Sequence, residues 1–165
     1  MKATAKFLAL LVLLGAFVAG SSQAGYEKYS VAAIHAHLYF HSTGEISPTD
    51  LLDGKQHALW NTIIGGGEAG KPSGAIWVLV DLTGPTFANI DGKLTLKAIE
   101  GEKTLLSQTV SLGIWFKEGQ KVVLPFLVYD TGCEKLEITA TLEDLPATMV
   151  ERALLKKVVP FECGE

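Results

Sequence analysis

Two strand-like segments and the turn between them occupy Lys121–Leu142, KVVLPFLVYDTGCEKLEITATL, and constrain the fold more than any other stretch. The first segment is apolar on both faces, and Asp130–Gly132 then favours a tight turn. Every second residue of the second segment is apolar, which is typical of a strand with one buried face: Leu136, Ile138, Ala140 and Leu142. The pattern predicts a β-hairpin in a chain built on sheets.

Three earlier segments also have the residue pattern of strands. Val31–His41 alternates strictly, with apolar residues at Ile34, Ala36, Leu38 and Phe40. Ala75–Thr83 is apolar at successive positions, which predicts a buried central strand with Trp77 in the core. Lys55–Ile64 fits a helical stripe or a strand, and its β-branched and aromatic residues favour the strand.

The remaining segments complete the β pattern. Lys93–Ile99 and Lys103–Leu112 flank a polar, glycine-containing turn and predict a second hairpin. Pro125 cannot donate a backbone hydrogen bond, so its strand is expected at a sheet edge or a bulge. Near the C-terminus a short amphipathic helix competes with a loop followed by a strand near Lys157–Glu162. The strand is favoured because it would place Cys163 beside a sheet.

The number and spacing of these segments predict the fold class. Seven or eight strands are separated by turn signals at intervals of roughly 8 to 12 residues. We therefore expect an all-β protein, an antiparallel β-sandwich of immunoglobulin-like or jelly-roll type. The sequence has no internal repeat and no linker, so residues 25–165 are interpreted as a single β-sandwich domain.

The first residues predict the compartment. Lys2 and Lys6 give the chain a positively charged start before an apolar run from Phe7 to Gly20. Ser22–Ala24 then supplies small residues for a cleavage site. These features are typical of a cleaved signal peptide over residues 1–24. The run is shorter than the roughly 20 residues that span a bilayer, and no later stretch approaches that length. We expect an exported protein, periplasmic or secreted, without a transmembrane segment in the mature chain.

Charge and cysteine content narrow the partners further. Without residues 1–24 the chain keeps 12 basic and 18 acidic side chains, a formal charge of −6, which disfavours nucleic acid as a partner. Cys133 and Cys163 are the two cysteines of the chain. In an exported protein a disulfide between them is the default expectation, and it would fasten the C-terminal tail.

The glycine-rich segment Gly65–Gly74, GGGEAGKPSG, is expected to be a loop. It matches most of the phosphate-loop pattern G-x-x-x-x-G-K-[ST], but Pro72 replaces the hydroxyl residue and a strand follows instead of a helix. We therefore interpret it as a candidate contact loop without nucleotide chemistry. Its candidate binding residues are Trp60, Gly65, Gly66, Gly67, Glu68 and Lys71.

Two histidines suggest an alternative function. His35 and His37 project from the same face of one strand, about 6 to 7 Å apart, so this H-x-H pair could chelate zinc or copper. A complete site would need a further ligand, for example His57 or Asp81. The competing interpretation is a polar face exposed to solvent.

No catalytic residues are assigned from the sequence. None of the serines stands in G-x-S-x-G, and neither cysteine has the context of a nucleophile. We expect a non-enzymatic binding module for a protein or carbohydrate partner, without a cofactor. A metal-binding protein that uses the histidine pair is the first alternative. A hydrolase whose site only the fold would assemble is the second.

Overall fold

The computed structural model describes residues 28–55, 73–85, 89–117 and 120–161. Nine strands and one short 3-10 helix lie within this part of the chain. They are β1 (Tyr29–Phe40), β2 (Glu45–Ile46), β3 (Ala75–Thr83), β4 (Asn89–Glu100), β5 (Lys103–Trp115), β6 (Val122–Tyr129), β7 (Leu136–Glu143), the helix Ala147–Met149, β8 (Val150–Arg152) and β9 (Leu154–Val159). The count exceeds the expected seven or eight because β2 and β8, with two and three residues, are too short to leave a pattern.

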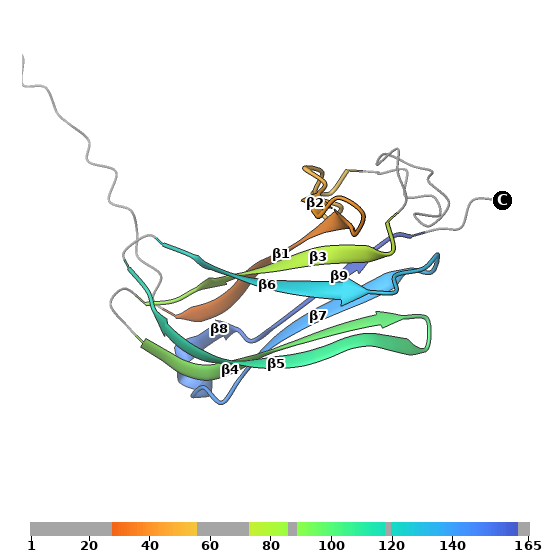
Figure 1. Cartoon of the computed structure of the whole chain (residues 1–165). Coiled ribbons are helices and arrows are strands. Elements are labelled where there is room, and N and C mark those ends of the chain that lie inside the picture. Colours follow the sequence, from red (N-terminus) through yellow and green to blue (C-terminus); the bar gives the residue numbers. More distant parts are fainter. Residues whose placement is uncertain (1–27, 56–72, 86–88, 118–119, 162–165) are drawn as a thin grey trace, which may run out of the picture.

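The strands form two sheets, which Figure 1 shows as stacked layers. One sheet has the order β2-β1-β3-β6 with β8 paired to β1, and the other has the order β5-β4-β7-β9. Within the described residues every pairing is antiparallel except that of β1 with β8. The prediction of an all-β protein is therefore confirmed at the level of two antiparallel sheets.

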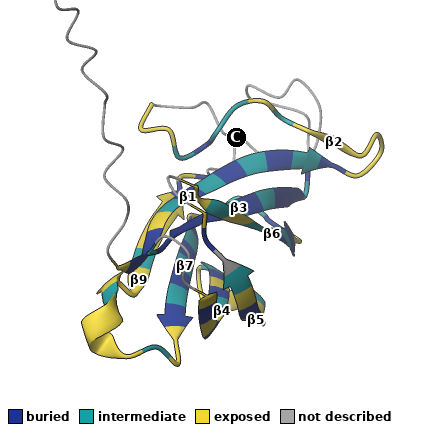
Figure 2. Ribbon diagram, turned by 90° about the vertical axis from the view of Figure 1, so that its left-hand side faces the viewer, coloured by how far each residue is buried: buried dark blue, intermediate teal, exposed yellow. Residues whose placement is uncertain are grey.

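The core lies between the sheets and is made of alternate residues of the strands. The apolar sets predicted for β1 and β7 are buried, with exposed fractions of at most 6%: Ile34, Ala36, Leu38, Phe40, Leu136, Ile138, Ala140 and Leu142. Figure 2 shows this alternation as dark and lighter bands along β1 and β3. Strict period-two patterning thus identified the inner faces of both strands correctly.

Trp77 does not lie in the core, and the prediction for it was wrong. Ile76 and Val78 are fully buried, so the Trp77 side chain between them points to the opposite face of β3, where it is half-buried. Leu79 is half-buried on the same outer face. Because β3 is apolar on both faces, its sequence does not indicate which face is turned inward.

The segment Lys121–Leu142 is not a hairpin, contrary to the sequence prediction. β6 pairs with β3 in one sheet and β7 pairs with β4 in the other, so the chain changes sheets between them. Contacts with both sheets hold this crossing: the N–H of Thr131 donates to the C=O of Gly74 (3.1 Å), and that of Gly132 to Glu100 Oε1 (2.7 Å). Alternation reports a buried face but does not identify the neighbouring strand.

Three further predictions agree with the structure. β4 and β5 form the second hairpin, with Gly101 at a φ of 55° in its turn, a conformation that favours glycine. Pro125 lies in β6, an edge strand of its sheet. The last element of the described residues is a strand and not an α-helix, although β9 begins and ends earlier than the predicted Lys157–Glu162.

Some predictions concern residues outside the described ranges. These are the signal peptide over 1–24, the strand predicted over 56–64 and the glycine-rich loop up to residue 72. Cys133 is described and Cys163 is not, so the disulfide between them stays a prediction. Among the described residues, none of the helices has the length and apolar character needed to cross a membrane.

Candidate functional site

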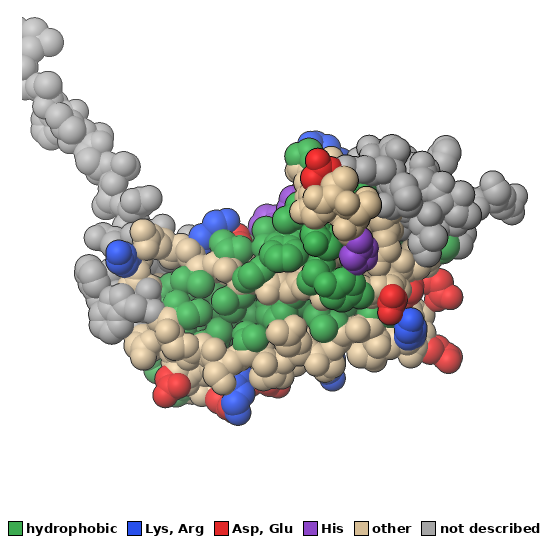
Figure 3. Space-filling view, in the orientation of Figure 1, with side chains coloured by type: hydrophobic (Ala, Val, Ile, Leu, Met, Phe, Trp, Pro, Cys, Tyr) green, Lys and Arg blue, Asp and Glu red, His purple; other side chains and the backbone are tan. Residues whose placement is uncertain are grey.

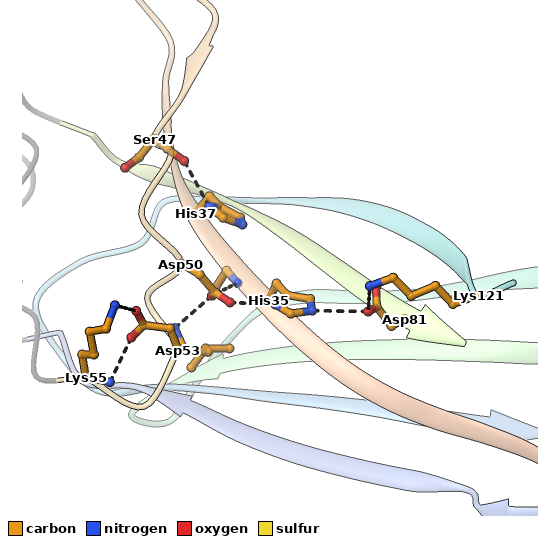
Figure 4. Close-up of polar contacts among 10 residues, drawn as sticks. His35, His37, Ser47, Asp50, Asp53, Lys55, Asp81 and Lys121 are labelled. Atoms are coloured by element: carbon orange, nitrogen blue, oxygen red, sulfur yellow. Dashed lines mark hydrogen bonds and ion pairs between the residues drawn. The ribbon is translucent and has the colours of Figure 1, made fainter. Parts of the chain in front are cut away.

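His35 lies between two carboxylates that come from different parts of the chain (Figure 4). Its Nδ1 is 2.7 Å from Asp50 Oδ2, and its Nε2 is 3.4 Å from Asp81 Oδ2. Lys121, which precedes β6, donates to the same Asp81 oxygen at 2.5 Å. Asp81 itself is buried, with 4% of the residue exposed. We call these four residues the His35 cluster, which joins β1, β3, the start of β6 and the segment after β2.

Asp50 holds the segment after β2, loop 47–55, against β1. Its Oδ1 accepts hydrogen bonds from the N–H groups of Ala36 and Leu52, both at 3.0 Å. The bond to Leu52, two residues further on, is the local turn contact that aspartate side chains favour. The N–H of Leu51 also donates to the C=O of Ala36 at 2.8 Å. Loop 47–55 therefore follows the edge of β1 through side-chain and backbone contacts.

The pairing of His35 with Asp50 changes the pKa of both groups. The hydrogen bond to Asp50 raises the pKa of His35 despite its partial burial, and the charges of Asp50 and Asp81 act in the same direction. Burial raises the pKa of the Asp50 carboxyl, but the hydrogen bonds from Ala36, His35 and Leu52 outweigh it and leave that pKa below its ordinary value. The geometry thus favours a charged imidazolium between carboxylates.

His37 fastens the same loop. Its Nδ1 lies 3.0 Å from the backbone oxygen of Ser47. The two histidines of the H-x-H pair thus share a face, as predicted, but each has a ring nitrogen bonded to loop 47–55. Among the residues with a described structure, no three His, Cys, Asp or Glu side chains are grouped so that they could hold a metal ion. His57 lies outside those residues, and the zinc or copper site stays a prediction.

The His35 cluster lacks the contacts of a hydrolytic site. A histidine that activates a nucleophile has one ring nitrogen directed at a hydroxyl or thiol. In the described part of the chain both ring nitrogens of His35 are directed at carboxylates instead. The buried carboxylate of Asp81 is in turn occupied by Lys121. The arrangement is that of a structural clamp.

A groove of about 350 Å³ borders the His35 cluster. It lies where β1, loop 47–55, β8 and β9 meet, and it is lined by Ala32, Ala33, Ile34, His35, Asp50, Leu52, Asp53, Arg152, Leu155 and Lys157. The groove was not predictable from the sequence, because its walls come from three separate segments, and the first and last of these lie more than a hundred positions apart. Pairing of β1 with β8 brings the first and last of these segments together, and hydrogen bonds to Ala36 hold loop 47–55 beside them.

The outer face of the β1-β3-β6 sheet carries a row of aromatic rings. The Tyr39 ring lies 5.3 Å from His41 and 6.3 Å from Trp77, measured between centroids. His41 stacks on Tyr129 at 5.3 Å with an interplanar angle of 22°. Half of Tyr129 is exposed. These four rings therefore form one continuous surface across the sheet.

Aliphatic side chains extend this surface along β3 and β6. The register pairs Leu79 with Pro125 and Trp77 with Leu127, so the apolar residues of the two strands lie side by side. Val123 is 42% exposed. Figure 3 shows hydrophobic side chains gathered on this side of the molecule. We call the set the outer apolar face: Tyr39, His41, Trp77, Leu79, Val123, Pro125, Leu127 and Tyr129.

The structure and the sequence prediction indicate different contact surfaces. All six residues proposed for the contact loop lie outside the described ranges: Trp60, Gly65, Gly66, Gly67, Glu68 and Lys71. The outer apolar face was missed, although the odd-numbered apolar residues of β6 were visible in the sequence. The chain matches no protein-family model, and no curated protein is significantly similar to it.

Proposed function

We propose that this protein is an exported, non-enzymatic interaction module that binds a protein partner through its outer apolar face. The observation that carries the proposal is the joined row of rings at Tyr39, His41, Trp77 and Tyr129. Exposed apolar patches of this kind mark contact surfaces, and tyrosine and tryptophan dominate binding energy at protein interfaces.

The aliphatic part of the face favours a protein over a carbohydrate. Sugar rings stack on aromatic faces, whereas protein interfaces combine aromatic and aliphatic side chains. Leu79, Val123 and Pro125 continue the surface beyond the rings. Binding to the face is also favoured over strand addition at β6, because Pro125 offers no N–H to an added strand.

Replacing Tyr129 with alanine should weaken partner binding by at least about tenfold, because Tyr129 is an aromatic residue of the face with half of its surface exposed. A photo-crosslinking residue at Leu127 would first identify the partner among proteins of the same compartment. The purified partner is then titrated against the wild-type and variant proteins.

Leu154→Ala is the matched control, since Leu154 is 55% exposed but lies on β9 in the other sheet. Equal affinities of the two variants would contradict the proposal. If no protein partner were found and the protein bound a glycan on a panel, with binding abolished by Tyr129→Ala, the ligand of the face would be a carbohydrate and not a protein.

We also propose that the sandwich is of immunoglobulin-like type. Without the short β2 and β8, seven strands remain, in the orders β1-β3-β6 and β5-β4-β7-β9. Lettered in chain order, these are A-B-E and D-C-F-G. Constant-type immunoglobulin domains have the sheets ABED and CFG, so only the position of strand D differs. Here strand D extends the sheet of strands C, F and G, as the additional strands do in variable-type domains.

We propose in addition that the protein is exported and that Cys133 and Cys163 form a disulfide bond. Leu136 of β7 pairs with Val159 of β9. Cys133 lies three residues before Leu136, and Cys163 lies four residues after Val159. This placement and the predicted signal peptide support a Cys133–Cys163 bond. The mature protein should therefore resist alkylation at both cysteines until it is unfolded and reduced. Alkylation of unfolded but unreduced protein, detected by intact mass, would exclude the bond.

A further inference from the structure

We infer that the groove along β1 is a binding site for a small organic carboxylate. The groove has a volume of about 350 Å³ and lies apart from the outer apolar face, on the side of β1 that faces loop 47–55 and β8. Its walls supply cationic side chains, backbone donors and an apolar surface. Such a combination is typical of sites for small ligands.

The described residues of the groove include basic side chains that are not balanced by an ion pair. Of its two acidic residues, Asp50 is paired with His35 at 2.7 Å and Asp53 with Lys55 at 3.1 Å. Its two basic residues, Arg152 from β8 and Lys157 from β9, form no ion pair with any described residue. The uncompensated charge therefore favours an anionic ligand, and guanidinium groups bind carboxylates through two parallel hydrogen bonds.

The edge of β1 adds backbone hydrogen-bonding groups. β8 pairs with β1 only at Tyr29 and Ser30, and loop 47–55 bonds to it again at Ala36. Because backbone groups alternate in direction along a strand, the N–H and C=O of Ile34 point to the same side as those of Ala36. No strand pairing within the described residues occupies this side of β1 at Ile34. Its N–H is thus available to an acceptor.

The rest of the lining suits an apolar body behind the charged group. Leu52 and Leu155 are half-buried at the groove, and the small side chain of Ala32 also lines it. A carboxylate with a short aliphatic chain would place its charge near Arg152 and Lys157 and its carbon atoms against the leucines. A phosphate ion would satisfy the charges but would leave the apolar wall without contact.

Butyrate is the probe for this inference, with the uncharged butyramide as its isosteric control. Titration of isotope-labelled mature protein at constant ionic strength should give saturable amide shifts at Ile34 and Leu155, with a dissociation constant on the order of 1 mM. Butyramide should bind at least about tenfold more weakly, because it lacks the charge.

The double variant Arg152→Gln, Lys157→Gln should weaken butyrate binding by at least about tenfold. Lys156→Gln is the matched control, because Lys156 lies next to Lys157 but is paired with Glu137 at 2.7 Å. No saturable shift with butyrate, equal binding of butyramide, or unchanged affinity in the double variant would each overturn the inference. Tighter binding of inorganic phosphate than of butyrate would overturn the assignment to a carboxylate.

Discussion

Replacing Asp50 with alanine should lower the free energy of unfolding by about 2 kcal/mol. The variant removes the acceptor for the N–H groups of Ala36 and Leu52, both at 3.0 Å, and the partner of His35 at 2.7 Å. The Asp50 side chain is 20% exposed, so water replaces part of these contacts and keeps the loss moderate. Urea unfolding followed by tryptophan fluorescence measures the change.

Two further variants separate the parts of this effect. Asp50→Asn keeps an oxygen for the backbone donors but removes the charge, so its loss should be smaller than that of Asp50→Ala. Asp91→Ala, on the exposed side of β4, should change the free energy of unfolding by less than about 0.5 kcal/mol. If Asp50→Ala were no more destabilising than Asp91→Ala, the clamping of loop 47–55 would contribute nothing to stability.

The contribution of His35 to this clamp should depend on pH. Its pKa is raised in the folded protein, so its stabilising effect is fully present below the unfolded value of about 6.5 and is lost as the pH rises through the folded pKa. Wild-type protein should therefore lose stability as the pH rises from about 6.5 through the raised pKa of His35, by an amount that Asp50→Ala largely removes. An identical pH dependence in both proteins would show that His35 gains its pKa shift elsewhere.

Replacing Gly84 with alanine should also lower the free energy of unfolding by about 2 kcal/mol. A Cβ at this position would lie 2.6 and 2.8 Å from Tyr29 Cδ1 and Cε1, and 2.9 Å from Phe116 Cε2. Both rings are buried, at 2% and 0% exposure, and they pack with centroids 6.0 Å apart. The Tyr29 hydroxyl also donates to the C=O of Asn89 at 3.0 Å, which limits how far its ring can move.

Gly113→Ala provides the comparison for Gly84→Ala, because an added Cβ at Gly113 meets no atom within 4 Å. Its free energy of unfolding should stay within about 0.5 kcal/mol of the wild-type value. Near-ultraviolet circular dichroism should change for Gly84→Ala alone, since that variant displaces two aromatic rings. Similar stability of the two variants would mean that Tyr29 and Phe116 adjust without strain.

Strand content was predictable from the sequence, but strand neighbours were not. The alternation in β1 and β7 reports one buried face, and the structure confirms it at positions such as Ile34 and Ile138. The prediction that β6 and β7 form a hairpin was wrong, because the turn residues Asp130–Gly132 occur both in short hairpin turns and in segments that cross between sheets. The pairing of β6 with β3 and of β7 with β4 distinguishes the two cases, and both are tertiary contacts.

The candidate sites were less predictable than the fold. His35 was recognised as a candidate metal ligand, but its partner Asp50, 15 positions away, was assigned no role in a site. Asp81 was named as a candidate partner of the histidine pair and does lie beside His35, but the sheet register that brings the two together is not encoded in any local pattern. Arg152 and Lys157 were not singled out, since basic residues with no motif around them are usually solvated. Sites assembled from several strands depend on tertiary pairing, which periodicity does not report.

The pairing of β1 with β8 has a consequence for the order in which parts of the fold form. Tyr29 and Ser30, near the start of the described chain, pair with Val150 and Arg152, near its end. The sheet therefore closes only after almost the whole chain is available. Closure over so many residues is slow compared with the formation of local contacts. Local pairings such as the β4–β5 hairpin need far less of the chain, so the contact of β1 with β8 should be among the last parts of the fold to form.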